Sequence, residues 1–358
     1  MVEKTCLLDM NIQELEAYVQ EKGESKFRGK QLFSWLHKGV SFQEMSNLSL
    51  EFRNKLAAEA IDQPVKISQS FVSAKDETVK FLYSFPDGNC VEGVLMKYHY
   101  GYTLCISTQV GCNMGCAFCA STLEGRVRNI SAGEMLGQII AANNFLSSEE
   151  GSPRVGHVVL MGSGEPFDNY QQVVKFLHLL RETGGVSLGL RNVSISTCGL
   201  VPQMKRFAEE GLPITLCISL HGADDEVRKK IMPIAHRYSI QEVLDAGKYY
   251  YGKTGRRIII EYALMKGIND NVAQAEKLAN LLRGMNCHVN LIALNEVKET
   301  GLKTVSTRET DLFLATLLKR KISATVRREM GSDIQGACGQ LRRAVLEKAE
   351  NENHSALS

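Results

Sequence analysis

The strongest constraint on the fold is a regular alternation of apolar strands and amphipathic helices that begins near residue 104. Short β-branched segments, typical of buried strands, recur at 103–108, 157–162, 192–197, 214–220, 257–265, 289–294 and 323–328. Helical periodicity lies between most of them, over 131–146, 169–182, 201–210, 271–282 and 307–320. This order predicts βαβ units around a parallel sheet. About six units in roughly 220 residues favour an α/β protein with a partial (β/α)6 barrel, whose chemistry gathers at the carboxyl ends of the strands.

Two further regions precede this barrel. The first sixty residues carry apolar side chains at helical spacing, such as Leu15 with Val19 and Leu32 with Leu36. The chain then changes to short β-branched and aromatic segments with the turn sequence Pro-Asp-Gly-Asn between them. We therefore expect five regions: a helical accessory domain at 1–62, a β-meander linking segment at 63–103, the barrel at 104–330, a C-terminal loop and helix at 331–348, and a disordered tail at 349–358.

The N-terminal segment and the lack of a long apolar run favour a reducing compartment. The N-terminus is acidic and soon amphipathic, unlike a signal peptide. No run of about 18 apolar residues appears, so we expect no membrane span and a cytoplasmic location. The ten cysteines are therefore interpreted as sites for metal binding or thiol chemistry rather than as a disulfide scaffold.

Three of the cysteines give the strongest chemical signal. Cys112, Cys116 and Cys119 follow the first barrel strand with C-x3-C-x2-C spacing. A structural zinc site usually takes four protein ligands. Three thiolates can instead hold three irons of a [4Fe–4S] cube and leave the fourth open for a chelating substrate such as S-adenosylmethionine (SAM). The spacing resembles the radical SAM superfamily, and zinc binding or coincidence are the alternatives.

Polar residues at later strand ends agree with a SAM site. Gly164 and Glu165 belong to a Gly-Glu-Pro turn after the strand at 157–162. A glycine lets the backbone approach a ligand closely, and the carboxylate can accept hydrogen bonds from the SAM amino group. The turn resembles the GGEP motif of the superfamily. Further candidates, each of which would more often be a capping or turn residue, end later strands: Ser196, Ser219, Leu220, His221 and Asn295.

Two more cysteines lie far apart in the sequence. Cys338 is flanked by small residues and has basic neighbours, which favour an approachable thiolate. Cys105 precedes the cysteine loop. Taken alone, each is more often a buried, inert cysteine than a catalyst.

Taken together, these motifs resemble the RlmN/Cfr family of RNA adenine methyltransferases over nearly the whole chain. The C-terminal sequence D-I-x-x-A-C-G-Q-L belongs to the resemblance, and the stretches at 26–40 and 115–134 are more similar to the C2-methylating RlmN branch than to the C8-methylating Cfr branch. The chain departs from the family pattern at Ser163, where Met is usual, and at Gln335 and Gly336, where Asp-Ala or similar is usual.

The resemblance implies a route with one [4Fe–4S] cluster per chain and two SAM molecules per turnover. Cys338 takes a methyl group from the first SAM, and a radical made from the second removes hydrogen from that group. The carbon then adds to adenine, and Glu92 matches the family position that takes the ring proton. Cys105 finally attacks the Cys338 sulfur, which leaves a Cys105–Cys338 disulfide. From the strand pattern alone, Glu92 is expected to face solvent.

The expected partners follow from charge and from the family. Residues 319–348 hold eight Lys and Arg against three Asp and Glu, a pattern that can neutralise phosphates or simply form a solvated surface. Family members modify 23S rRNA before ribosome assembly is complete, and some also modify tRNA. An electron donor such as flavodoxin or ferredoxin, a monomer and no membrane partner are expected. The candidate phosphate contacts are Arg126, Arg128, Arg327, Arg328, Arg342 and Arg343.

Two rival functions stay open. Methylation at adenine C8, as in the Cfr branch, would use the same residues. A non-catalytic iron–sulfur RNA-binding assembly factor would need the cysteine loop but would have no evident use for Cys105 and Cys338.

Overall fold

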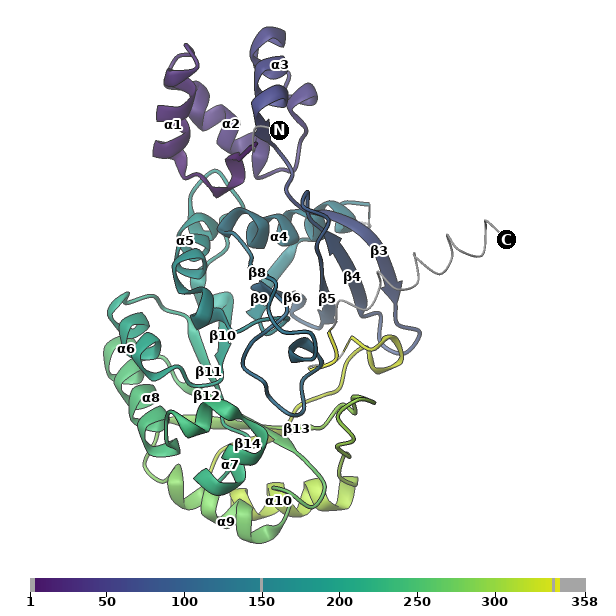
Figure 1. Ribbon diagram of the computed structural model, residues 1–358, viewed down its shortest axis with the longest axis vertical. Helices are drawn as coiled ribbons and strands as arrows, with labels where there is room; N and C mark the ends of the chain where they lie inside the picture. The colour runs from purple at the N-terminus through teal and green to yellow at the C-terminus, as the bar shows by residue number, and fades with distance from the viewer. Residues whose placement is uncertain (1–3, 149–150, 337–338, 342–358) are drawn as a thin grey trace.

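The computed structural model describes residues 4–148, 151–336 and 339–341. Ten strands form one sheet in the order β14-β13-β12-β11-β10-β9-β6-β5-β4-β3 (Figure 1). Every neighbouring pair from β6 to β14 is parallel, and the pairs from β3 to β6 are antiparallel. Within the described residues the sheet stays open, with β14 and β3 as its edges. The α/β class and the partial barrel are therefore confirmed.

The parallel strands coincide with the segments expected from the sequence. Their bounds are β6 Gly101–Ile106, β9 Val155–Leu160, β10 Val193–Thr197, β11 Thr215–Ser219, β12 Ile258–Leu264, β13 Cys287–Ala293 and β14 Ala324–Val326. They are rich in fully buried Val, Ile and Leu because helices cover one face and loops the other.

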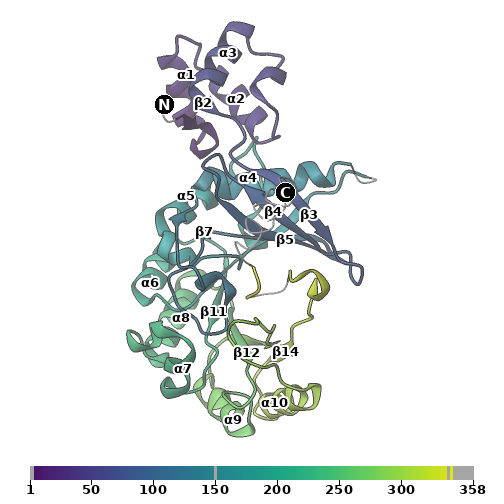
Figure 2. The same cartoon turned by 45° about the vertical axis from the view of Figure 1, so that its right-hand side comes forward.

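Five of the seven described helices of the barrel, all except α5 and α6, begin at a residue whose side chain caps the helix. The seven helices are α4 Ala132–Leu146, α5 Tyr170–Arg181, α6 Val201–Glu209, α7 Asp225–Ile231, α8 Ile240–Thr254, α9 Val272–Leu281 and α10 Thr307–Lys319. Ser131 and Glu134 form the capping box at α4, where the Ser131 hydroxyl accepts from the Glu134 N–H at 3.1 Å. The sequence pattern predicted no helix in the stretch that contains α7 and α8. Helices α4, α5, α6, α8, α9 and α10 lie on the outer side of the curved sheet (Figures 1 and 2). Helix α7 ends beside the cysteine loop, where the Ile231 carbonyl accepts from the Ala117 N–H.

The antiparallel part of the sheet is the expected β-meander. It consists of β3 Lys66–Val72, β4 Val79–Ser84 and β5 Cys90–Tyr98, and β5 pairs with β6. Because β6 belongs to both parts, the meander extends the barrel sheet without a break. A separate short ladder joins β7 Gln109–Val110 to β8 Arg128–Asn129 and closes the cysteine loop.

The accessory region packs α1 Ile12–Glu21, α2 Arg28–Leu36 and α3 Leu50–Glu59 above the sheet (Figure 1). Short strands β1 Thr5–Cys6 and β2 Ala60–Ile61 pair at its base. Asp9 accepts a hydrogen bond from the Gly133 N–H at 2.6 Å at the start of α4, and the His37 Nδ1 accepts one from the Val186 N–H at 3.2 Å. These contacts fix the accessory region to the barrel.

No helix among the described residues combines the length and apolarity needed to cross a bilayer.

Candidate active site

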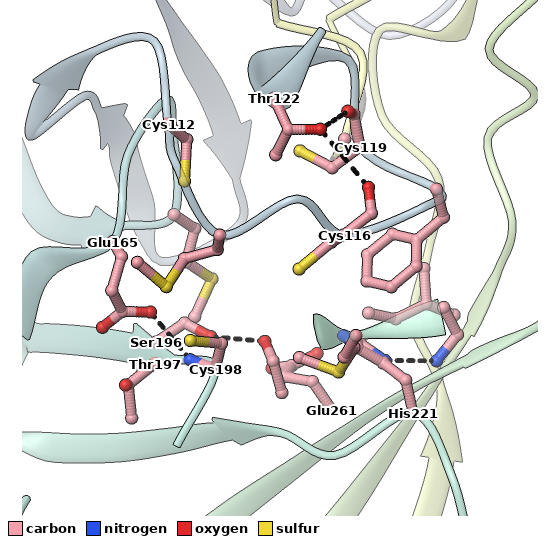
Figure 3. A pocket seen from close by; sticks show the side chains of 18 of the residues that line it. Cys112, Cys116, Cys119, Thr122, Glu165, Ser196, Thr197, Cys198, His221 and Glu261 are labelled. Carbon is pink, nitrogen blue, oxygen red and sulfur yellow. Dashed lines mark hydrogen bonds between the residues drawn. The ribbon is translucent and has the colours of Figure 1, made fainter. Parts of the chain in front are cut away.

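A cavity of about 160 Å³ lies at the carboxyl ends of the parallel strands, beneath the cysteine loop. Its lining combines residues from the cysteine loop with residues from the ends of β9, β10, β11, β12 and β13 (Figure 3). Carboxyl ends of parallel strands are where α/β barrels place their chemistry, because the connecting loops converge there. The position of this cavity therefore matches the expectation from the sequence.

The three cysteines of the loop line this cavity together. Cys112 and Cys116 are buried and Cys119 is half-buried, and their sulfurs face a common space (Figure 3). The Thr122 hydroxyl donates to the carbonyl of Cys119 at 2.9 Å, and the Ala117 N–H donates to the carbonyl of Ile231 at 2.9 Å. These bonds hold the loop over the strand ends.

The donor set fits a cluster with one thiolate at each of three corners. Burial raises the pKa of Cys112 to about 12 and also raises that of Cys116, so these thiols keep their protons until a cationic centre displaces them. Within the described residues, no three His, Cys, Asp or Glu side chains are arranged as ligands of a single metal ion. A [4Fe–4S] cube takes its protein ligands on separate irons, one thiolate to each.

The Gly-Glu-Pro turn contacts the cavity next to the cysteines. Gly164 has a φ of +107°, and an added Cβ would lie 2.7 Å from the Gln109 backbone nitrogen. Both Glu165 oxygens accept backbone hydrogen bonds, from Cys198 at 2.8 Å and from Phe167 at 3.1 Å. Burial raises the pKa of Glu165. The carboxylate is therefore held rigidly at the cavity wall, where it also caps the next short helix.

The later strand ends bring most of the expected polar residues to the same cavity. Ser196, Ser219, His221 and Asn295 all line it, and the Ser196 and Ser219 hydroxyl oxygens lie 3.1 Å apart. The Leu220 side chain does not reach it: Leu220 is fully buried and absent from the lining. Its carbonyl accepts from Arg228 at 3.1 Å instead.

His221 is fixed in one tautomer. Its Nδ1 accepts a hydrogen bond from the Ala263 N–H at 2.9 Å, so the Nε2 carries the proton. Burial lowers the pKa of His221 to about 3, with a further contribution from the charge of Arg228. The Phe118 ring packs edge to face against the imidazole, with 4.8 Å between the two ring centroids. His221 can therefore act only as a neutral hydrogen-bond donor at this position.

Sequence reasoning missed several residues of the cavity wall. Glu261 is buried in β12, and its carboxylate lies 3.8 Å from the Arg327 guanidinium. Cys198 lines the cavity beside Glu165. A charged residue inside the apolar strand 257–265 was the available signal for Glu261. For Cys198 no signal exists, because a lone cysteine after a strand is ordinarily inert.

Cys105 and Glu92 lie on the same face of the sheet, and Cys105 lines a pocket next to the cavity. Cys105 pairs with Val94 across β5 and β6, and Glu92 stands two residues from Val94 on the same face of β5. Glu92 is buried and forms an ion pair of 3.1 Å with Lys80. The expectation that Glu92 faces solvent is wrong, because a further part of the chain covers this face of the meander.

That covering part is the C-terminal segment, described over 330–336 and 339–341. Met330 and Leu341 pack against Val94, Met96 and Cys105 on the inner face. Cys338 lies outside the described residues. On either side of it, Gly339 lines the main cavity, and Gly336 lines a neighbouring pocket that contains Cys105.

Comparisons with known proteins agree over the length of the chain. Residues 106–282 match the radical SAM superfamily, and residues 5–61 match the N-terminal domain of ribosomal RNA large subunit methyltransferases. A probable dual-specificity RNA methyltransferase RlmN from Alkaliphilus oremlandii is 50% identical over 97% of this chain and all of its own length. The chain belongs to the RlmN family of radical SAM RNA methyltransferases.

Further relatives support the family assignment. The chain is 47% identical to a probable RlmN of Clostridium novyi over 95% of this chain and 98% of that protein. The crystal structure of a radical SAM methyltransferase from Sphaerobacter thermophilus superimposes with a TM-score of 0.91 and 39% identity, covering 95% of this chain and 99% of that one. Membership of the RlmN family implies a [4Fe–4S] cluster, SAM and an RNA substrate.

The two departures from the RlmN pattern fall at different kinds of position. Ser163 contributes a backbone contact, because its carbonyl accepts a hydrogen bond from the Thr108 N–H at 2.8 Å. Ser163 is absent from the residues that line the cavity. Gln335 is exposed and has a φ of +51°, a left-handed conformation that only a minority of non-glycine residues adopt.

The candidate phosphate-binding arginines separate into four groups. Arg126 is paired with Asp168, and Arg128 with Asp87 and Glu134, so their charges are neutralised within the protein. Arg327 lines the cavity rather than the outer surface, whereas Arg328 is exposed. Arg342 and Arg343 lie outside the described residues.

Proposed function

We propose that this enzyme methylates C2 of adenine 2503 in 23S rRNA and of adenine 37 in tRNA. The observation that carries the proposal is that the three-cysteine cavity adjoins the pocket that contains Cys105. The described residues on either side of Cys338 reach these two spaces: Gly339 lines the three-cysteine cavity, and Gly336 lines the pocket of Cys105. The family resemblance to the RlmN branch supports C2 rather than C8.

The cavity residues have distinct proposed roles toward the cofactors. Cys112, Cys116 and Cys119 hold one [4Fe–4S] cluster, which, when bound, supplies the electron that turns SAM into a hydrogen-abstracting radical. The Glu165 carboxylate accepts hydrogen bonds from the SAM amino group, and His221 donates a hydrogen bond to SAM through its Nε2–H. The remaining contacts to SAM come from Gly164, Ser196, Ser219, the Leu220 backbone and Asn295.

The two remote cysteines carry and release the carbon. The Cys338 thiolate attacks the methyl carbon of the first SAM and displaces S-adenosylhomocysteine, which leaves an S-methyl thioether on the protein. A second SAM is consumed in removing one hydrogen from that methyl group, so each turnover takes two. After the carbon joins adenine, the radical adduct would return one electron to the cluster and give up its ring proton. The Cys105 thiolate then forms a bond to the Cys338 sulfur while the carbon–sulfur bond breaks. The electron pair of that bond stays with the carbon, which takes up a proton and becomes the methyl group of the released RNA. A thiol reductant then reopens the disulfide.

Glu92 is the proposed acceptor of the adenine ring proton. It lies on the same face as Cys105, and Lys80 at 3.1 Å keeps it from being an isolated buried charge. The Glu92 carboxylate therefore lies on the sheet face that also carries the proposed resolving thiol.

The RNA must expose its adenine, because a stacked and paired base cannot enter a cavity at the strand ends. The exposed Arg328 and the accessory helices are the proposed contacts to RNA. The 23S rRNA before full assembly, tRNA, a flavodoxin or ferredoxin as electron donor, a monomeric state and a cytoplasmic location complete the proposal.

The deciding experiment analyses both product and protein. Reconstituted enzyme, SAM, reductant and an unmodified 23S rRNA fragment should yield 2-methyladenosine by nucleoside mass spectrometry. Peptide analysis of the resting enzyme should find a methyl group on Cys338. Recovery of 8-methyladenosine would instead assign the Cfr-type reaction, and an unmethylated Cys338 with no 5′-deoxyadenosine would indicate an RNA-binding factor without turnover.

Cys105→Ala should separate carbon transfer from release. Without the resolving thiol, Cys338 should stay covalently attached to RNA, and the adduct should appear as a shifted band on denaturing gels. Cys287→Ala, which alters a buried cysteine of β13 outside the cavity, is the matched control and should release methylated RNA normally. Normal yields of free product from Cys105→Ala would exclude Cys105 from the mechanism.

A further inference from the structure

The turn between β3 and β4 makes a set of contacts that the proposed reaction leaves unexplained. This turn, residues 73–78, meets the C-terminal segment more than 250 residues later in the chain (Figure 2). The Asp333 carboxylate accepts from the Ser73 hydroxyl at 2.7 Å and from the Ala74 N–H at 3.0 Å. These are charge-assisted bonds, which are stronger than neutral ones.

A second carboxylate forms the reciprocal contact. Asp76 of the turn accepts from the Gly331 N–H at 2.9 Å and from its own neighbour Thr78 at 3.1 Å. Gly331 has a φ of +64°, and an added Cβ would lie 3.0 Å from the Thr78 side chain. Each partner therefore supplies one carboxylate to the other, and the approach leaves little room for a side chain at residue 331.

The C-terminal segment is also held on the far side of Cys338. The Gly339 carbonyl accepts from the Ala120 N–H at 2.8 Å, directly after the last cysteine of the loop. The Leu341 carbonyl accepts from the Ser121 hydroxyl at 3.1 Å. The segment thus has one anchor on the meander and one on the cysteine loop.

The meander anchor and Cys105 belong to the same rigid sheet. The Ser73 N–H closes the turn by donating to the Thr78 carbonyl at 2.7 Å. From there, Val79 pairs with Leu95, and Val94 pairs with Cys105. A segment docked on the turn is therefore fixed relative to Cys105 through continuous strand pairing.

We propose that the β3–β4 turn is the dock for the methyl-carrier segment, and that Asp333 and Asp76 are positioning residues that hold Cys338 within reach of Cys105. The inference rests on the proposed roles of these two cysteines. It assigns a function to the turn between β3 and β4, which has no role in the proposed reaction. Removing the dock should lower the effective concentration of one thiol at the other, because an unanchored segment samples more positions.

The test measures thiol–disulfide exchange in the full-length, cluster-loaded protein without oxygen. The reaction is balanced: oxidised glutathione plus the two thiols gives the Cys105–Cys338 disulfide plus two reduced glutathiones. After equilibration in glutathione buffers, acid quenching and alkylation, mass spectrometry of the two cysteine peptides gives the effective concentration.

Asp333→Asn should lower this effective concentration roughly tenfold, since it removes the charge from two hydrogen bonds. Ser73→Ala should lower it less, and adding Ser73→Ala to Asp333→Asn should have little further effect, because both remove the same contact. Asp311→Asn, an exposed carboxylate on α10, is the matched control and should leave the value unchanged.

A separate readout distinguishes positioning from loss of folding. The iron–sulfur absorbance of Asp333→Asn should match that of the wild type, and kcat should fall while the KM for RNA stays constant. If Asp333→Asn lost its cluster, the test would rest on Ser73→Ala alone. An effective concentration in Ser73→Ala equal to that of the wild type would then overturn the proposed dock. Wild-type exchange with no drop in either variant would also overturn it. Absence of the disulfide in the wild type would instead refute the proposed role of Cys105.

Discussion

Gly164 illustrates how one residue can determine the shape of the cavity wall. Its φ of +107° disfavours any residue with a Cβ, and the Gln109 backbone leaves no space for one. Because Glu165 follows directly, the glycine also sets where the carboxylate stands. The turn is therefore fixed by backbone sterics before any ligand binds.

Gly164→Ala should lower the free energy of unfolding by about 1–3 kcal/mol, through backbone strain and the clash with Gln109. Urea titration followed by circular dichroism measures the change. Gly156→Ala in β9 is the control, since an added Cβ there would meet only the Tyr102 carbonyl at 3.8 Å. Equal stability of the two variants would contradict the steric argument.

The buried Arg228 side chain links the loops that follow two neighbouring strands of the barrel. It is fully buried on α7, and its guanidinium donates to the carbonyl of Leu220 at 3.1 Å and to that of Cys198 at 2.6 Å. These carbonyls follow β11 and β10, so one side chain holds two loops of the cavity in register. A planar fork with several donors suits this task better than a single ammonium group.

Arg228→Lys should therefore cost about 2–3 kcal/mol of stability, because a buried charge remains while carbonyls lose their donors. The expected measurement is a lower urea midpoint. Lys230→Arg, exposed on the same helix, should leave the midpoint in place. A midpoint for Arg228→Lys within error of the wild type would show that the fork geometry is dispensable.

At the scale of the molecule, the accessory region and the barrel meet at a buried histidine. Burial lowers the pKa of His37 to about 4, below its ordinary 6.5. The unfolded chain binds this proton first as the pH falls, so stability is complete above pH 6.5 and declines between about 6.5 and 4. The loss is at most about 3 kcal/mol.

His37→Gln should flatten this acid-induced decline, since the glutamine cannot titrate. Thermal unfolding at pH 7.5 and pH 5 provides the measurement, with the wild type showing the larger drop in Tm. A drop of the same size in both proteins would assign the acid sensitivity to other groups.

The sequence predicted the parallel strands because a strand buried on both faces requires an uninterrupted apolar run. It also predicted the capping box at Ser131, which depends only on local spacing, and placed Cys112, Cys116 and Cys119 in one loop. It did not predict helices α7 and α8. The solvent-facing expectation for Glu92 failed because alternation along β5 cannot reveal what covers the sheet.

What the sequence determined by itself is therefore what short-range physics controls: the elements, their order, the cysteine loop and the family. Only the tertiary structure decided which residues meet. Asp333 meets Ser73 across 260 residues of chain, and Arg228 donates to the Cys198 carbonyl across 30 residues. The burial of Glu92 beside Lys80 joins neighbouring strands. Such contacts depend on how the sheet curves and on which segment covers its inner face, and no local pattern of residues encodes either.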